Sequence, residues 1–275
     1  MASSVSRVSL HRFSFADDDV LACVSGRTGG VSIAPYASLN LSFGVGDEPT
    51  AVVENRARLC LALRHPLDAL TVANQVHSGD VVVVDESHRG SGAHTADDAV
   101  ADADALVTAS PGVLLAVLLA DCVPVVLVDR VRSVVAVAHA GWRGTVAHVA
   151  ANTVACMRDA FGCDPADIRA GIGPSIGPAS YEVGAEVVEA ARRAYPDSPE
   201  VIRFDGARTT FDLWAANASD LRRAGVLREH IEISGIDSHT ATDRYFSHRA
   251  ARPTGRFMAL AALGPRRVVQ ASRPR

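Results

Sequence analysis

The middle of the chain carries a series of short hydrophobic runs that polar residues rarely interrupt. Six of them have the length and composition of strands: Asp80–Asp85, Ala105–Thr108, Val113–Leu119, Val123–Val128, Ser133–Ala138 and Ile231–Ser234. Because most of these runs do not alternate with polar positions, they are typical of strands that are covered on both faces. The connections between residues 105 and 138 are short, which favours antiparallel meander pairing over βαβ winding.

Segments with helical patterning surround these runs. The pattern predicts helices over Asn55–Leu63, from Thr145 to about Phe161, over Val183–Ala194 and from just after Thr210 to about Arg223. Thr145 can cap the second of these helices, and Gly162 can end it. Strands clustered in the middle with helices around them predict a mixed α/β or α+β domain.

Composition narrows the chemistry that the chain can perform. The 275 residues suffice for a substantial core, and the net charge of −4 gives no basic field for nucleic acid or an anionic membrane. All 27 basic residues are arginine, so Schiff-base chemistry, a lysine general base and a P-loop lysine are excluded. A bound phosphate or carboxylate would therefore be held by arginine, by backbone N–H groups or by a metal.

The cysteines and the hydrophobic runs indicate the cellular location of the protein. The five cysteines are Cys23, Cys60, Cys122, Cys156 and Cys163. They are scattered along the chain without a C-x-x-C pair, so they do not form a disulfide framework. The N-terminal residues lack the apolar stretch of a signal peptide. The most hydrophobic run, Val113–Val128, is interrupted by Asp121 and Pro124 and is too short to cross a bilayer. We therefore expect a cytoplasmic protein that does not enter a membrane.

Three side chains that commonly bind metals lie at the ends of predicted strands. His77 precedes one strand, Cys122 follows another, and His139 ends the next, just before the turn residue Gly141. Two imidazoles and a thiolate suit Zn²⁺, and three protein ligands leave one tetrahedral position open, as in catalytic zinc sites. Water in that position has its pKa lowered toward roughly 7.

The same residues allow other interpretations, because their spacing matches no compact metal-binding motif. Cys122 can be a small buried hydrophobic residue, with His77 and His139 hydrogen-bonded in turns. Alternatively, Cys122 is a nucleophile and one of the two histidines is its base. Asp121 would then orient an imidazole, although a carboxylate beside a thiol raises the thiol pKa.

Two further segments have unusual composition. The stretch "GIGPSIGPASYEVG" has four glycines and two prolines, and it predicts a rigid loop whose backbone N–H groups can approach a ligand. The stretch "SHTATDRYFSHRAARPTGRF" is either a charged surface loop or an anion-binding rim, and it contains His239, Arg244, His248, Arg249 and Arg256.

Taken together, these segments resemble the YfiH or laccase-domain family, whose members are named polyphenol oxidase, purine nucleoside phosphorylase or peptidoglycan editing factor. The matching stretches cover nearly the whole chain and include "GRTGGVSIAPYASLNLSFGVGDEP", "ENRARL", "NQVHSGDVVVVD", "DADALVT", "LLADCVPVVLVD", "VAVAHAGWRGTV", "GIGPSIGPASYEVG", "FDLWAAN" and "RYFSHRAARPTGRF". The resemblance implies one α+β domain over residues 1–275, a layered α/β/β/α sandwich. Flexible N-terminal residues and the arginine-rich tail "RRVVQASRPR" would flank it.

The resemblance also implies an activity and a site. It implies zinc, with copper as an alternative, bound by His77, Cys122 and His139, which would also be the catalytic residues. The implied reaction is phosphorolysis of adenosine, inosine or methylthioadenosine to the free base and a ribose 1-phosphate, together with adenosine deamination. Substrate-binding residues would be Arg56 and Asn40, joined by Arg143, all taken from their positions in this sequence. The partners would be purine nucleosides and phosphate, and the chain would be a monomer or a weak homo-oligomer.

The chain departs from the family pattern at two places. It has His239-Thr240 where the family usually has Cys-Thr, and Phe246-Ser247-His248-Arg249-Ala250 where the family has F-S-Y-R-R. Neither change involves the proposed metal ligands, and both would alter the pocket rim and with it the substrate preference. Three other functions stay open: a cysteine hydrolase acting on peptidoglycan precursors through Cys122, a copper-dependent polyphenol oxidase, and a non-enzymatic binding module.

Overall fold

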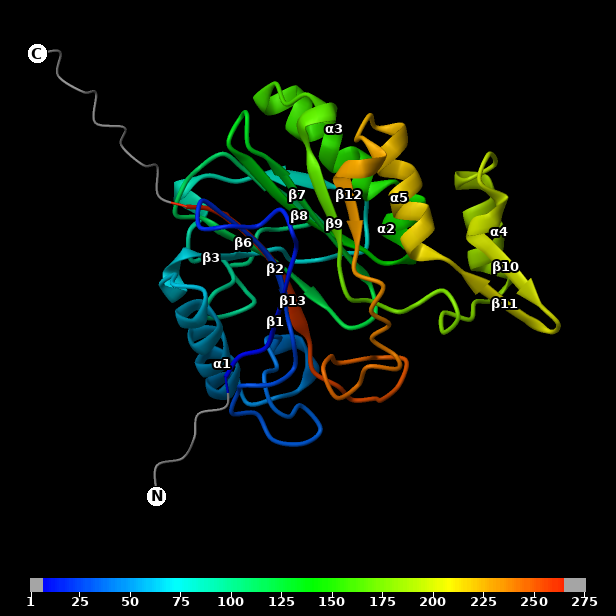
Figure 1. The fold of residues 1–275 in the computed structure, drawn as a ribbon. Helices are drawn as coiled ribbons and strands as arrows, with labels where there is room; N and C mark the ends of the chain where they lie inside the picture. The colour runs from blue at the N-terminus through cyan, green and yellow to red at the C-terminus, as the bar shows by residue number, and fades with distance from the viewer. Residues whose placement is uncertain (1–6, 265–275) are drawn as a thin grey trace, which may run out of the picture.

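A computed structural model describes residues 7–264. The first six residues and the arginine-rich tail, which we expect to flank the domain, lie outside the described residues. Residues 7–264 form five α-helices, two large mixed sheets and one separate hairpin. The predicted α+β class is therefore confirmed, and the elements stack in four layers (Figure 1).

The two large sheets lie face to face. The five-stranded sheet has the order β1 (Leu10–Arg12), β2 (Val20–Ser25), β13 (Phe257–Leu263), β6 (Leu114–Leu119) and β3 (Leu70–Val72). The six-stranded sheet has the order β12 (Ile231–Ile233), β9 (Arg169–Ile172), β7 (Val123–Asp129), β8 (Val134–Ala140), β5 (Ala105–Thr108) and β4 (Val81–Val83). Three pairs are parallel, β3 with β6, β4 with β5 and β9 with β12, and the others are antiparallel.

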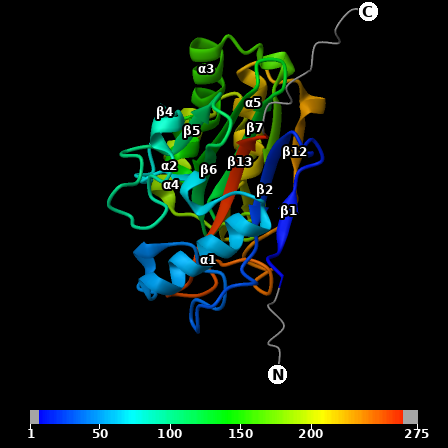
Figure 2. The same ribbon diagram turned by 90° about the vertical axis from the view of Figure 1, so that its left-hand side faces the viewer.

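Helices cover the two outer faces. Helix α1 (Pro49–Ala62) packs on the five-stranded sheet, as Figure 2 shows from that side. The six-stranded sheet is covered by α2 (Trp142–Val146), α3 (Val149–Phe161) and α5 (Leu213–Arg223). Helix α4 (Ala185–Ala194) and the hairpin of β10 (Ile202–Asp205) and β11 (Arg208–Phe211) lie beside α2, at the edge farthest from α1. Within residues 7–264, no helix is both long and hydrophobic enough to cross a bilayer.

The central strands bury both of their faces, as their uninterrupted hydrophobic runs predicted. In β8, Ala136 and Ala138 pack toward the helices, while Val135 and Val137 pack toward the five-stranded sheet. Side chains alternate between the faces of a strand, so the next odd position, His139, lies on the face between the sheets. The strand pattern thus directs an imidazole into the space where the two sheets meet.

The predicted meander is wrong in one respect. Strands β7 and β8 form an antiparallel hairpin and β5 pairs with β8, but β6 belongs to the other sheet. The chain therefore crosses between sheets before and after β6. The second crossing is short because Asp121 takes a left-handed backbone conformation, with φ 87°, directly before Cys122. A sharp turn of this kind allows a short connection to change sheets as well as to form a hairpin.

Two predicted helices also differ from the structure. Helix α1 begins at Pro49, six residues before the predicted start, because proline at the first helical position fits the geometry there. The helix predicted to start at Thr145 is split in two, and Thr145 lies inside α2 rather than capping a helix. The break is at His148, whose left-handed φ of 58° starts α3 afresh.

Several strands had no signal in the hydrophobic pattern. The most central is β13, whose sequence FMALAAL lies between β2 and β6 and is entirely buried. Alanine and leucine favour helices when local propensity alone decides, so only the sheet environment makes this segment a strand. The strands β1, β2, β3, β9, β10 and β11 were missed as well.

Candidate active site

The fold brings His77, Cys122 and His139 together at the edge where the two sheets meet. His77 lies in the loop between β3 and β4, Cys122 lies between β6 and β7, and His139 is the penultimate residue of β8. Their ligand atoms all lie within 4.8 Å of one another. The imidazole rings stand nearly perpendicular, with centroids 4.9 Å apart. Three residues separated by up to 62 positions therefore form one group, here called the His/Cys/His group.

The donor set and the available space fit a metal ion. Two imidazole nitrogens and a thiolate are ligands that both zinc and copper accept. Gly141 closes over the group: a Cβ atom there would lie 3.0 Å from Cys122 Sγ and 3.3 Å from His77 Cδ2. A larger residue would press on the proposed ligands, so the glycine keeps this space open.

Asp104 fixes the orientation of His139. Its Oδ1 lies 2.7 Å from His139 Nδ1, and its Oδ2 accepts hydrogen bonds from Ser78 N, Ser78 Oγ and Val76 N. A carboxylate only accepts, so Nδ1 carries the proton and Nε2 is left for a ligand. The same carboxylate therefore orients one histidine and anchors the residues on both sides of the other, His77.

The sequence analysis did not single out Asp104. A signal was present, because Asp104 directly precedes a predicted strand within the family-like stretch "DADALVT". Its role depends on strand register, however: Ala105 pairs with Ala138, which sets Asp104 opposite His139. Spacing along the chain does not reveal that register.

Electrostatics within the group favour a thiolate beside an imidazolium. Burial alone would raise the pKa of the Cys122 thiol, but the charge of His139 and hydrogen bonds with both imidazoles lower it to about 6. Burial would lower the pKa of His139, but the charge of Cys122 and the hydrogen bond to Asp104 raise it to about 9. Between these values Cys122 is ionised, which is the form that binds metals and attacks electrophiles.

Two residues of the site hold left-handed backbone conformations that only glycine adopts easily. They are His77, with φ 62°, and Asp121, with φ 87°. The Asp121 carboxylate accepts hydrogen bonds from Ser238 Oγ, at 2.7 Å, and from the Arg249 backbone N–H, at 2.6 Å. Asp121 thus fastens the segment near the C-terminus to the turn that carries Cys122, and Asp104 is the carboxylate that orients an imidazole.

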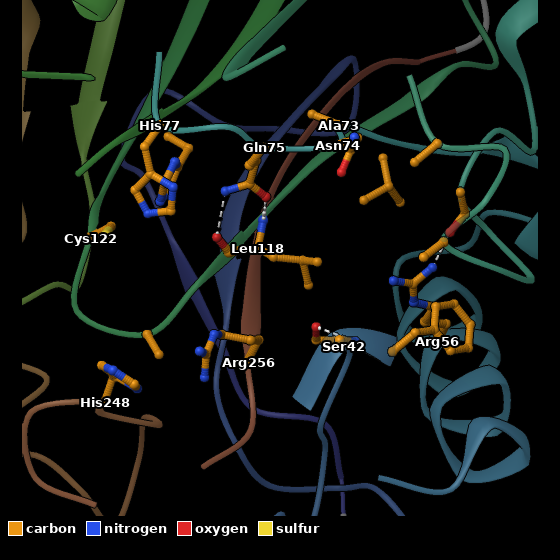
Figure 3. Close-up of a pocket in the computed structure, with 18 residues that line it drawn as sticks. Ser42, Arg56, Ala73, Asn74, Gln75, His77, Leu118, Cys122, His248 and Arg256 are labelled. Atoms are coloured by element: carbon orange, nitrogen blue, oxygen red, sulfur yellow. Dashed lines mark hydrogen bonds between the residues drawn. The ribbon is translucent and has the colours of Figure 1, made fainter. Parts of the chain in front are cut away.

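A cavity of about 480 Å³ opens beside the His/Cys/His group. In Figure 3, His77, Cys122 and His248 lie at one end of the cavity and Arg56 at the other. Gln75 lines the wall between the two ends, where its amide exchanges two hydrogen bonds with the Leu118 backbone. Gln75 was missed because its amide replaces a strand partner, which no sequence motif indicates.

The three predicted substrate-binding residues occupy different places. Arg56 lines the cavity but is only 2% exposed, and its guanidinium donates to the carbonyl oxygens of Leu41, Gly92 and Ala93. Asn40 is buried behind the cavity wall and is not among the lining residues. Arg143 is not among them either, and its guanidinium stacks on its neighbour Trp142.

The segment near the C-terminus contributes part of the predicted rim. His248 and Arg256 line the cavity at or near the end that holds Cys122, whereas His239, Arg244 and Arg249 are not among the lining residues. The glycine-rich loop after β9 also stays outside the cavity lining. It supports the site indirectly, since Ile176 N donates a hydrogen bond to the Asp121 carbonyl oxygen.

A second histidine–aspartate pair with a buried carboxylate lies in the helical layer. His148 Nδ1 is 2.9 Å from Asp220 Oδ1, and the Tyr195 hydroxyl donates to Asp220 Oδ2 and to the Thr145 carbonyl oxygen, each at 2.7 Å. Thr145 belongs to α2, the short helix that follows Gly141. This pair joins α2 to α5 and has no cysteine beside it.

Fold and site together define a class: a layered α+β protein with a His/Cys/His group where its two sheets meet, at one end of a cavity. A family model described as "Multi-copper polyphenol oxidoreductase laccase" matches residues 21–264. The chain therefore belongs to this family, the YfiH or laccase-domain family, as the sequence motifs predicted.

Related proteins agree over nearly the full length. "Purine nucleoside phosphorylase" of Deinococcus radiodurans is 42% identical over 249 residues, covering 90% of this chain and 91% of the relative. "Purine nucleoside phosphorylase YlmD" of Geobacillus stearothermophilus is 41% identical over 234 residues, covering 84% and 85%. The crystal structure of the Geobacillus YlmD superimposes with a TM-score of 0.87 at 39% identity, covering 90% of this chain and 93% of that one. The predicted layered sandwich is confirmed by this agreement.

Proposed function

We propose that the protein is a zinc-dependent purine nucleoside phosphorylase that acts on adenosine, inosine and methylthioadenosine. The observation that carries the proposal is the His/Cys/His group at one end of a cavity whose volume, about 480 Å³, lies in the range of small-ligand sites. The names of the relatives support the choice of reaction. The five free cysteines support a reducing, cytoplasmic location.

In the proposed reaction, a phosphate oxygen forms a bond to ribose C1′ as the bond between C1′ and purine N9 breaks. The electron pair of the broken bond leaves with the purine, which takes up a proton. The products are the free base and ribose 1-phosphate, or 5-methylthioribose 1-phosphate when methylthioadenosine is the substrate. Such a reaction requires that phosphate and nucleoside be held together in one water-poor cavity, which turns an encounter of two reactants into a single bound step.

The residues of the chain divide this work. When zinc is bound by His77, Cys122 and His139, it supplies a Lewis acid at that end of the cavity. Asp104 keeps His139 in the tautomer that leaves Nε2 free. Arg56, Asn40 and Arg143 are the proposed substrate-binding residues. Of these three, only Arg56 lines the cavity and can contact a ligand there directly.

Adenosine deamination is proposed as a second outcome at the same site. Water would replace the 6-amino group of the purine and release ammonia, giving inosine. This reaction needs no phosphate, so the two activities are separable by omitting phosphate from the assay.

A cysteine hydrolase is the second candidate, and a specific observation favours it. Cys122, His139 and Asp104 follow the order of nucleophile, base and orienting carboxylate, with the Cys122 pKa lowered to about 6. In that case Cys122 Sγ would attack an amide of a peptidoglycan precursor, forming a thioester and releasing an amine, and water would then cleave the thioester. Iodoacetamide would abolish this activity in metal-free protein.

Copper-dependent oxidation of phenols has less support. Within residues 7–264, one group of His, Cys, Asp and Glu side chains is arranged to hold a metal ion. A multicopper oxidase needs several copper ions to collect electrons, and one such group holds too few ligands for them.

One experiment separates these functions. Metal content of the purified protein is measured alongside base release from adenosine and inosine, with and without phosphate, for the wild type and for His77→Ala. About one zinc per chain and phosphate-dependent base release, both lost in the variant, are expected. Base release or metal content that survives His77→Ala unchanged would contradict the proposal, and metal-free activity that iodoacetamide blocks would favour the hydrolase.

A further inference from the structure

We infer that Arg256 and His248 form the binding site for the phosphate co-substrate, and that Asn40 positions Arg256 for this role. The inference rests on the proposed phosphorolysis and adds to it the place where the anion binds. Both residues line the cavity, and in Figure 3 the Arg256 side chain points toward the side that holds Cys122 and His248.

Arg256 retains donors for an anion. Its Nη1 donates to the carbonyl oxygens of Thr254 and Gly255, whereas Nε and Nη2 take part in none of the hydrogen bonds found among residues 7–264. None of the ion pairs in the described part of the chain involves Arg256. A half-buried guanidinium without a carboxylate partner favours an anionic ligand, and its planar fork matches the oxygens of phosphate.

Arg56 is less suited to this role. It donates to three carbonyl oxygens, and the face of its guanidinium lies 4.4 Å from the centre of the Phe43 ring. It is also at the opposite end of the cavity from Cys122. These contacts tie α1 to the residues around Gly92, so Arg56 mainly shapes its end of the cavity.

Asn40 clamps the backbone of Arg256. Asn40 Oδ1 accepts a hydrogen bond from Arg256 N at 2.9 Å, and Asn40 Nδ2 donates to the Ser42 carbonyl oxygen and to Asp47 Oδ2. The carbonyl oxygen of Arg256 accepts from Leu41 N at 2.9 Å. Asn40 does not line the cavity, but its hydrogen bond fixes the backbone position of Arg256, from which the side chain extends into the cavity lining.

His248 is presented to the cavity by fixed neighbours. Phe246 is fully buried, Ser247 Oγ accepts a hydrogen bond from Ala250 N, and the Arg249 backbone N–H is held by Asp121. Either protonation state of an imidazole offers at least one N–H donor, so His248 can add a hydrogen bond to an anion held by Arg256.

Charge decides between the two reactants. Adenosine and inosine are neutral, and phosphate is the one anion among the reactants of the proposed reaction. Arg256 makes no direct ion pair among residues 7–264, although the charges of Cys122 and Asp121 act on it. In a partly desolvated site such a cation is stabilised further by the reactant of opposite charge. We therefore assign phosphate to the end near Arg256 and leave the rest of the cavity to the nucleoside.

The test compares Arg256→Gln with Arg193→Gln in the zinc-loaded protein. Arg193 lies on α4, where its side chain is 70% exposed and pairs with Glu189. Arg256→Gln is expected to raise the KM for phosphate about 10- to 100-fold and to leave the KM for inosine nearly unchanged. Arg256→Lys keeps the charge and should recover part of the loss, and Arg193→Gln should match the wild type.

Three supporting measurements use other residues and ligands. His248→Gln keeps an N–H donor and should change the KM for phosphate less than His248→Leu does. Asn40→Leu should raise the KM for phosphate in a protein that still binds zinc. Sulfate should inhibit the wild type competitively against phosphate, and much less effectively in Arg256→Gln.

The outcomes separate this inference from the proposed function. A wild type that releases no base with phosphate present would overturn the phosphorylase proposal itself. A wild type with phosphate-dependent activity, together with an Arg256→Gln variant whose KM rises for inosine and not for phosphate, would overturn the phosphate site alone. Should Arg256→Gln fail to fold, Arg256→Lys, the His248 pair and sulfate competition give the same decision.

Discussion

Two histidine–aspartate pairs with buried carboxylates look alike at first and differ in consequence. In the pair of His139 and Asp104, and in the pair of His148 and Asp220, an imidazole Nδ1 lies within 2.9 Å of a buried carboxylate. The first pair lies where the sheets meet, with Cys122 beside the ring, and the second lies in the helical layer with Tyr195 beside the ring.

Burial acts on both carboxylates in the same direction, yet their net pKa shifts are opposite. Burial alone would raise the pKa of Asp104, but hydrogen bonds from His139 and Ser78 outweigh it and lower the pKa below its usual range. Burial raises the pKa of Asp220, and the donors Tyr195 and His148 do not compensate fully. The hydrogen-bond donors around a buried carboxylate therefore decide the direction in which its pKa shifts.

The comparison teaches that such a pair does not define an active site. What defines the site is the group that faces the second imidazole nitrogen, which is the thiol of Cys122 in the first pair. Four experiments test this distinction between the two pairs.

The largest difference is expected from the same substitution in both histidines. His139→Asn should abolish stoichiometric zinc binding and reduce phosphorolysis more than the roughly 10- to 100-fold that loss of an outer residue causes. His148→Asn should keep both within about threefold of the wild type, because asparagine tolerates the left-handed backbone there. Metal analysis and base-release assays measure the two effects, and equal losses in both variants would refute the distinction.

A smaller difference is expected between the two carboxylates. Asp104→Asn should weaken zinc binding about 10- to 100-fold, since it disturbs the tautomer and orientation of His139. Asp220→Asn should leave zinc affinity unchanged. Competition with a chromophoric chelator gives both affinities, and a variant of Asp104 that binds zinc as well as the wild type would contradict the role assigned to it.

The pH dependence of alkylation tests the charge state of Cys122 in metal-free protein. Its lowered pKa predicts that the rate with iodoacetamide rises as the pH increases through about 6, because the thiolate forms there. His139→Asn removes a positive neighbour and should move this midpoint upward by about 1 to 3 units, whereas His148→Asn should not.

Selectivity in that experiment comes from the other cysteines. Burial raises the pKa of Cys23, Cys60 and Cys163 to about 12 and also raises that of Cys156. Mass spectrometry at neutral pH should therefore find the label on Cys122, and bound zinc should protect it. A wild-type midpoint at the ordinary thiol value would show that the imidazoles do not stabilise the thiolate.

The smallest effect is expected on stability alone. Tyr195→Phe removes a hydroxyl that serves both Asp220 and the Thr145 carbonyl oxygen, so the free energy of unfolding should fall by about 1–3 kcal/mol. Zinc affinity should not change. Urea denaturation measures the loss, and a variant with normal stability but impaired zinc binding would mean that this network belongs to the site.

Much of the candidate site could be predicted because its three proposed ligands lie at or near the ends of uninterrupted hydrophobic runs. His77, Cys122 and His139 could be grouped for that reason, and the family motifs strengthened the grouping. Asp104 could not, since its partner is set by the register of β5 against β8. Arg256 was recognised only as part of a charged stretch. What distinguishes it from Arg244 is its hydrogen bonding to Asn40 and Leu41, and these residues are far away in the sequence.

The fold was predictable in class and in part of its detail. Strands that form long runs of β-branched residues were found, because valine and isoleucine are enriched in strands. The alanine-rich β13 and the transfer of β6 to the other sheet were not found. Both depend on which segments become neighbours in the folded protein, and a linear pattern does not specify that.

Two of the three proposed ligands lie on segments that pass from the five-stranded sheet to the six-stranded sheet: His77 between β3 and β4, and Cys122 between β6 and β7. A cation bound by them and by His139 would cross-link the five-stranded sheet to the six-stranded sheet. A ligand that binds only the folded state raises the melting temperature. Metal binding would therefore raise the melting temperature of the protein even when no substrate is present.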